Sequence, residues 1–135
     1  MGHTLRRGTR AALTAVAAAA LLVGCTEEPR KPVMPGPTST AAAAPQDAAA
    51  LAERYRAAGG DPDVYGIQVE DGPEGIPRVV IRTRNADDED AIFRRQNTSV
   101  TTHLTTKEGL SFKKGYFIDV FGPDGTLIHR MDARP

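Results

Sequence analysis

The stretch VYGIQVEDGPEGIPRVVIRTR, residues 64–84, predicts two antiparallel strands joined by a turn-rich loop. Apolar residues alternate with small or polar ones on both sides of the loop DGPEGIP (71–77), which is the period of a strand with one buried face. The register that gathers the apolar side chains on one face pairs Val69 with Val79, Ile67 with Ile81, and Tyr65 with Thr83. On the opposite face, Glu70 lies across from Arg78 and Gln68 across from Val80.

The stretch GYFIDVFGPDGTLIHRMD, residues 115–132, follows the same plan around the turn signal Gly-Pro-Asp-Gly (122–125). Taking 122–125 as the loop predicts an apolar face on which Val120 pairs with Leu127, Ile118 with His129, and Tyr116 with Met131. The other face pairs Phe121 with Thr126, Asp119 with Ile128, and Phe117 with Arg130. Each hairpin therefore has one apolar face and one mixed face.

Two segments outside the hairpins have helical features. Residues 47–58 place Leu51 and Tyr55 at helical spacing before Gly59-Gly60, and an acidic run suits the start of a second helix over 87–107. Six of the nine residues in 98–106 are serine or threonine, which favour strands or turns, so this part is predicted either helical or extended. The order α-β-β-α-β-β predicts an α+β fold, with a four-stranded, mostly antiparallel sheet and both helices on one face.

The charge is unevenly distributed along the chain. The 17 basic residues balance the 17 acidic ones, but the first 24 residues contain three arginines and no acid. Without them, 14 basic and 17 acidic side chains remain, a net charge near −3. That balance excludes the strongly basic field of a typical nucleic-acid-binding protein and a polybasic membrane-surface patch.

The amino terminus has the features of an export signal. Residues 1–10 are polar and basic, and residues 11–24, AALTAVAAAALLVG, are uncharged. Fourteen helical residues span about 21 Å, which is short of a ~30 Å hydrocarbon core. We therefore predict a signal peptide over 1–24, with a transmembrane helix as the weaker alternative.

The apolar run ends in Leu22-Val23-Gly24-Cys25, and Cys25 is the chain's one cysteine. These four residues resemble the lipobox of bacterial lipoproteins. The resemblance implies diacylglyceryl transfer to the Cys25 sulfur, cleavage before Cys25 and acylation of the new amino terminus. The domain would then be lipid-anchored on the extracytoplasmic face of the cell membrane. An ordinary secretory signal with a chance cysteine is the alternative, and Arg6-Arg7 leaves the export route open between the general and the twin-arginine pathways.

Residues 25–45 are predicted to be the lipidated cysteine followed by a disordered linker. Five of the ten prolines lie in 26–45, and the segment lacks apolar periodicity. The globular domain is predicted over 46–135.

No motif in the sequence predicts catalysis, a metal or a cofactor. There is no GxSxG elbow, no HExxH and no cysteine pair, and the acidic run 87–90 lacks the alternation and glycine of a calcium loop. His129 is predicted on the core face and His103 on a solvated surface. A histidine–carboxylate pair would have to combine one of these with Asp119 or Asp132.

Two functions from different classes follow. The first is a non-enzymatic interaction domain that binds an envelope protein or an anionic ligand. Its candidate interaction face is the mixed, solvent-facing side of the sheet, which carries Phe117, Phe121, Arg82, Arg84 and Arg130, because aromatic and arginine side chains together are favoured at binding surfaces. The alternative is a small extracytoplasmic hydrolase.

Overall fold

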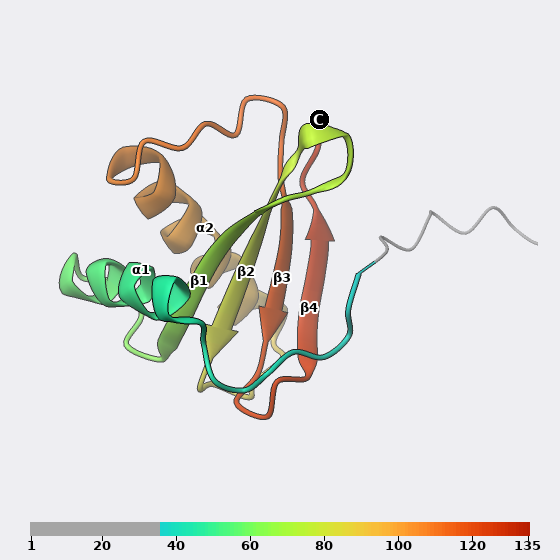
Figure 1. Ribbon diagram of the computed structural model, residues 1–135. Coiled ribbons are helices and arrows are strands. Elements are labelled where there is room, and N and C mark those ends of the chain that lie inside the picture. Colours follow the sequence, from blue (N-terminus) through green and yellow to red (C-terminus); the bar gives the residue numbers. More distant parts are fainter. Residues whose placement is uncertain (1–35) are drawn as a thin grey trace, which may run out of the picture. The chain divides into compact units, whose positions relative to one another are not determined.

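The computed structural model describes residues 36–135, which belong to one compact unit. The elements in chain order are α1 (Gln46–Ala57), β1 (Val64–Asp71), the short 3₁₀ helix η1 (Pro73–Gly75), β2 (Pro77–Thr83), α2 (Asp90–Thr106), β3 (Phe117–Phe121) and β4 (Leu127–Asp132). Two helices and one four-stranded sheet confirm the predicted α+β fold, in the predicted order (Figure 1). The predicted signal peptide and Cys25 lie outside the described residues.

The strands lie in the order β1-β2-β3-β4 within the sheet. The two outer pairs are antiparallel hairpins, and the central pair β2–β3 is parallel. A parallel pair needs a connection that returns to the same end of the sheet, and α2 provides it. The sheet is therefore mixed, with two antiparallel pairs and one parallel pair.

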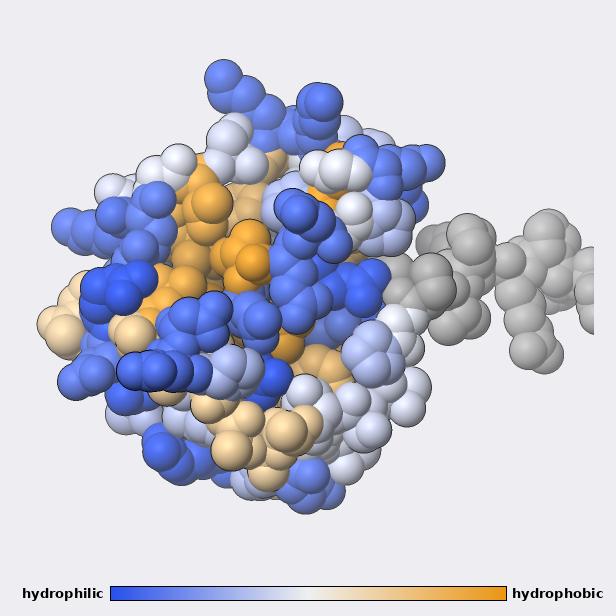
Figure 2. Space-filling model, viewed as in Figure 1, coloured by the Kyte–Doolittle hydropathy of each residue, from blue (hydrophilic) through white to orange (hydrophobic). Residues whose placement is uncertain are grey.

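Both helices pack on one face of the sheet. The buried apolar cluster joins α1 and α2 to the inward-facing residues of three strands, and comprises Ala52, Tyr55, Val64, Ile67, Val79, Ile81, Phe93, Val100, Leu104, Ile118 and Val120. Further apolar side chains that pack against it, such as Leu51 and Phe112, are only partly buried. Figure 2 shows hydrophobic surface between α1 and the upper part of the sheet, where the core is incompletely covered. Within residues 36–135, no helix is long and apolar enough to cross a membrane.

The threonine-rich segment is helical throughout, so the sequence alternative of an extended segment is not adopted. Threonine hydroxyls donate hydrogen bonds to backbone carbonyls four residues earlier, from Thr101 to Asn97 and from Thr105 to Thr101. Val100 and Leu104 face the sheet and are fully buried. Tertiary packing therefore outweighs the weak helix propensity of threonine here.

The first hairpin has the predicted register over most of its length. Val69 pairs with Val79, Ile67 with Ile81, Gln68 with Val80, and Glu70 with Arg78. The predicted pair of Tyr65 with Thr83 is wrong, because a bulge between Val64 and Gly66 places Val64 opposite Thr83. A bulge inserts one extra residue and so changes the register beyond it.

The predicted register of the second hairpin is wrong by two residues. Val120 pairs with His129 instead of Leu127, and an irregularity between Val120 and Phe121 lets Phe121 pair with Leu127. An offset of two preserves which residues share a face, because side chains alternate with period two. The mixed face now pairs Asp119 with Arg130 and Phe117 with Asp132.

A segment that we call the strap, residues 36–44, runs along the edge of β4 and then across the mixed face of the sheet towards α1 (Figure 1). Its backbone pairs with the β3–β4 turn, where the amide of Thr40 donates to the carbonyl of Gly125. Farther across the sheet, the Tyr65 hydroxyl donates to the carbonyl of Ala42. The last residues of the predicted linker are therefore in contact with the domain.

Candidate functional site

Four charged residues gather at the centre of the mixed face, and we call them the arginine cluster: Arg78, Arg82, Asp119 and Arg130. Arg78 and Arg82 lie two residues either side of Val80 on β2, and so share its face. Asp119 on β3 is opposite Val80 on one side and opposite Arg130 of β4 on the other. The strand register therefore places three arginines and one aspartate on neighbouring positions of the same face.

Asp119 and Arg130 form the tightest pair of the cluster. Arg130 donates through Nε to Oδ1 of Asp119 at 2.8 Å and through Nη2 to Oδ2 at 3.0 Å, which is bidentate geometry. Asp119 is 1% exposed. Hydrogen bonding to Asp119 raises the pKa of Arg130 above its ordinary value, while burial acts in the opposite direction. Nη1 of Arg78 approaches the same carboxylate at 3.8 Å.

Arg82 is held differently, because it has no carboxylate partner among residues 36–135 within ion-pair distance. Its side chain is almost completely buried, with 5% of the residue exposed. Nη2 donates to the Thr40 hydroxyl at 3.0 Å, but Nε and Nη1 have no hydrogen-bond partner in the described part of the chain. Burying a charge without full hydrogen bonding costs several kcal/mol, so an arginine in this state needs an explanation.

The mixed face is covered, contrary to the prediction of a solvent-facing surface. Phe117 and Phe121 are 2% and 1% exposed, so neither is accessible for contact with a partner in this structure. Figure 2, viewed from this side, shows hydrophilic residues over the upper part of β3 and β4. The all-buried run of β3, from Phe117 to Phe121, is the pattern of a strand covered on both faces.

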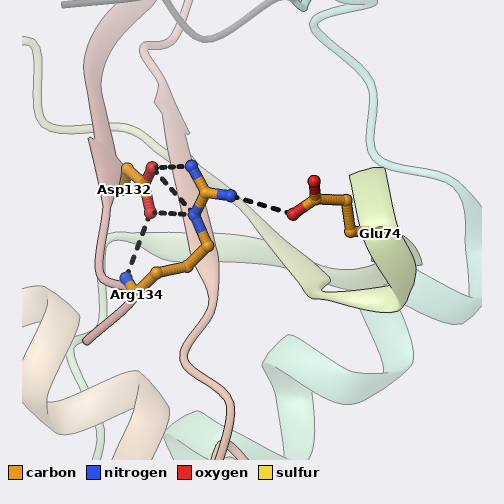
Figure 3. Close-up of polar contacts among 3 residues, drawn as sticks. All are labelled: Glu74, Asp132 and Arg134. Atoms are coloured by element: carbon orange, nitrogen blue, oxygen red, sulfur yellow. Dashed lines mark hydrogen bonds and ion pairs between the residues drawn. The ribbon is translucent and has the colours of Figure 1, made fainter.

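Two charged residues near the carboxyl terminus close the upper end of this face. Arg134 binds Asp132 at 2.6 Å and Glu74 of the β1–β2 loop at 3.2 Å (Figure 3). Its guanidinium also lies 5.0 Å from the ring centroid of Phe117, on which Arg78 stacks at 5.8 Å. Hydrogen bonds from Arg134 lower the pKa of Asp132. Phe117 thus contacts Arg78 and Arg134, and not Arg130, the residue with which the predicted register paired it.

Arg84 lies apart from the arginine cluster. It follows the last residue of β2, is exposed, and stacks on the ring of Tyr65 at 5.0 Å. Five residues were predicted for the interaction face. The structure places Arg82 and Arg130 in the arginine cluster, buries Phe117 and Phe121 on the same face of the sheet, and leaves Arg84 outside the cluster.

His129 is not positioned to act with a carboxylate. It stacks on Phe93 with ring centroids 4.5 Å apart, on the face of the sheet that carries the helices. Asp119 lies on the opposite face, as the alternation of the strands predicts. Asp132 is bound to Arg134.

His103 is buried, 8% exposed, and not on a solvated surface as predicted. It lines a cleft of about 180 Å³ between the end of α1 and α2, together with Ser99 and Tyr55. Nε2 of His103 lies 3.5 Å from Oε1 of Glu108, without hydrogen-bond geometry. Glu108 is already bound by Arg54, whose hydrogen bonds lower the pKa of Glu108.

The serine in this cleft is not linked to the histidine. The Ser99 hydroxyl is 2.7 Å from the Tyr55 hydroxyl, and no hydrogen bond joins Ser99 to His103 in the described part of the chain. A nucleophile needs its base within hydrogen-bond reach. The cleft brings Ser99 and His103 together without the connections that would activate the serine.

Sequence reasoning missed the role of the strap, and it gave Asp119 a chemical role only as a partner for a histidine. Alternation along FIDVF places Asp119 on the mixed face, but its position between Arg78 and Arg82 depends on the parallel pairing of β2 with β3, which alternation does not show. Nothing in the strap could have been found in this way, because it acts through its backbone and one threonine hydroxyl.

Residues 36–135 contain no group of three or more histidine, cysteine, aspartate or glutamate side chains placed to hold a metal ion. No protein-family model matches the chain, and neither curated proteins nor solved structures show a significant similarity to it. The arginine cluster is therefore the feature of the described residues that bears most on function.

Proposed function

We propose that this chain is a bacterial lipoprotein, anchored through Cys25 on the extracytoplasmic face of the cell membrane, whose domain is a non-enzymatic binding module. The arginine cluster receives an anionic group of the partner. Cys25 and the signal peptide support the address through their lipobox resemblance. The cluster supports the binding role.

The observation that carries the proposal is the state of Arg82. Two of its three guanidinium nitrogens, Nε and Nη1, are buried without a hydrogen-bond partner among residues 36–135. An arginine that only stabilised the fold would be expected to have a carboxylate or a full set of acceptors. Nε and Nη1 donate on opposite sides of the guanidinium group, and an oxygen of a carboxylate or phosphate would accept a charge-assisted hydrogen bond from either of them, as such groups do when arginine recognises them.

The hydrolase alternative has weaker support. Its best location is the cleft at His103, where Ser99 already bonds to Tyr55 and Glu108 to Arg54. A binding role needs no such connections, only a place for negative charge.

The test is crosslinking of the full chain in intact cells, comparing wild type with Arg82→Gln. Glutamine removes the charge and keeps a polar side chain with the same aliphatic stem. The matched control is Arg84→Gln, which removes the same charge from an exposed arginine outside the cluster. We expect Arg82→Gln to lose the crosslinked partners and Arg84→Gln to keep them.

Thermal unfolding of both variants accompanies the crosslinking. Arg82→Gln removes an incompletely bonded buried charge, so its unfolding midpoint should not fall by more than about 4 °C, roughly 1 kcal/mol in a domain of this size. A crosslinking pattern that is the same in wild type and in a folded Arg82→Gln variant contradicts the binding role.

A further inference from the structure

The strap pairs with the edge of β4 as a short added strand would. The amide of Thr40 donates to the carbonyl of Gly125 at 2.8 Å, and the amide of Leu127 donates to the carbonyl of Thr38 at 2.9 Å. Between them, Ser39 and Thr126 form an antiparallel bridge. These contacts join backbone to backbone, so any extended peptide in this place could make them.

Every strap group that contacts the arginine cluster is an uncharged acceptor. The carbonyls of Gly36 and Pro37 accept from Arg130 at 3.2 and 2.6 Å, and the Thr40 hydroxyl accepts from Arg82. The sequence from 29 to 46 contains no aspartate or glutamate. A carboxylate in the same place would accept the same hydrogen bonds and add the attraction between opposite charges.

The strap has little apolar burial to hold it in place. All its residues are exposed except Thr40 and Ala44, which are partly buried. Its attachment depends on a few hydrogen bonds at the surface, and segments of this kind open at low cost. The strap thus covers Arg82 but leaves two of its guanidinium nitrogens without a hydrogen-bond partner in the described part of the chain.

We propose that the strap is an intramolecular substitute for the partner, and that the partner is an extended acidic peptide segment that displaces it and pairs with β4. This rests on the proposed binding role of the arginine cluster. An anionic lipid surface would satisfy the charges, but it has no backbone to replace the hydrogen bonds at Gly125 and Leu127, so a peptide is favoured.

The test measures binding of a fluorescein-labelled peptide of four Glu-Thr repeats to the purified full chain in mild detergent. A peptide with glutamine in place of glutamate is the control probe. We expect the acidic peptide to bind at least about tenfold more tightly than the neutral one, with an affinity that falls as salt is raised.

Gly125→Ala tests the pairing with β4. A Cβ on Gly125 would lie 2.2 Å from the carbonyl oxygen of Thr40, so it obstructs any backbone that pairs in this place. Gly125 also has a φ of +80°, at which alanine is strained. Gly75→Ala is the matched control, because Gly75 has a φ of +72° in the other hairpin loop and nothing within 4 Å of the added Cβ.

If the peptide pairs with β4 as the strap does, Gly125→Ala should bind the acidic peptide more weakly than Gly75→Ala, because the added Cβ obstructs the backbone of the peptide as it obstructs that of the strap. Gly75→Ala should bind as wild type does.

Thr40→Pro tests the competition, because it removes the strap's amide donor to Gly125 and its hydroxyl acceptor for Arg82 without altering the hairpin. It should bind the acidic peptide up to about tenfold more tightly than wild type, since a site blocked nine-tenths of the time loses a factor of ten in apparent affinity.

Weaker or unchanged peptide binding in Thr40→Pro overturns the competition, and binding by Gly125→Ala as tight as that of Gly75→Ala overturns the pairing with β4. Binding to phosphatidylglycerol vesicles but not to the acidic peptide overturns the choice of a peptide partner. No binding of the acidic peptide overturns this inference, while the crosslinking of Arg82→Gln judges the proposed function separately.

Discussion

At the scale of single residues, Asp119 is a buried charge whose cost depends on its partner. It is a carboxylate in the interior of the sheet, and its two oxygens are bound by one guanidinium group from the neighbouring strand. Taking a carboxylate out of water is costly unless its partner is well placed. The pair therefore stabilises the folded state only while both members are present.

We expect Arg130→Gln to lower the free energy of unfolding by about 3 kcal/mol, because it leaves Asp119 buried without its bidentate partner. Urea titration of the full chain measures the loss. In a double-mutant cycle, Asp119→Asn with Arg130→Gln should lose less than the sum of the two single variants. Additive losses would show that the two residues act independently.

Sequence patterns predicted which residues share this face of the sheet, but not that the face is covered. Strand alternation placed Arg82, Arg130, Phe117 and Phe121 on the same face, and the structure agrees. It could not show that this face is covered, because burial there comes from a segment distant in the sequence and from the carboxyl terminus. Arg84 was included because alternation continues past the end of β2, where the chain has already left the sheet.

At the scale of elements, α2 shows how packing overrides propensity. The helix buries Phe93, Val100 and Leu104 against the sheet, although threonine dominates its second half. Local preference predicted strand or turn for that half, whereas the apolar spacing predicted a helix. The spacing prevailed, because burial of large side chains outweighs a few tenths of a kcal/mol for each threonine.

Thr105→Ala should therefore raise the free energy of unfolding by about 0.5 kcal/mol. Thr105 is exposed, and its hydroxyl bonds only to carbonyls of its own helix, those of Thr101 and Thr102. Alanine has the higher helix propensity and loses no tertiary contact. Leu104→Ala, one residue earlier on the buried face, should instead lose about 2–5 kcal/mol. Denaturant midpoints measure both, and a destabilised Thr105→Ala would contradict the argument.

The sequence pattern predicted correctly which side chains of the second hairpin share a face, but it predicted the wrong pairing of residues across that hairpin. The turn Gly-Pro-Asp-Gly fixes the position of the bend, yet the irregularity after Val120 moves the pairing by two residues. A bulge depends on how the chain twists against its neighbours. Nothing in the local residue pattern at Val120 or Phe121 distinguishes it.

At the scale of the whole molecule, the segment before Gln46 shows what composition leaves out. Proline and alanine favoured a linker, and residues 36–44 nevertheless contact the sheet. Composition reports how much apolar surface a segment can bury. It does not report backbone hydrogen bonds to a sheet edge, which any residue except proline can donate.

The proposed anchor is tested on the intact chain in its bacterial membrane. Cys25→Ser should abolish incorporation of radiolabelled palmitate, because the sulfur is the acceptor that the lipobox resemblance implies. Membrane fractionation should then find the protein either unprocessed or released. A Cys25→Ser variant that is of mature length and still partitions with membranes would contradict the lipoprotein assignment.

The attachment of the strap to β4 also determines where a mechanical load enters the domain. With the chain held at Cys25, as proposed, a pull along the linker reaches Gly36 before it reaches α1. The two backbone bonds at Gly125 and Leu127 lie on the outer edge of the sheet, so the strap can peel away while the four strands stay paired. The freed segment would add about 30 Å of slack, at about 3.5 Å per extended residue. Tension on the anchor would thus lengthen the tether and uncover the arginine cluster before it strained the fold.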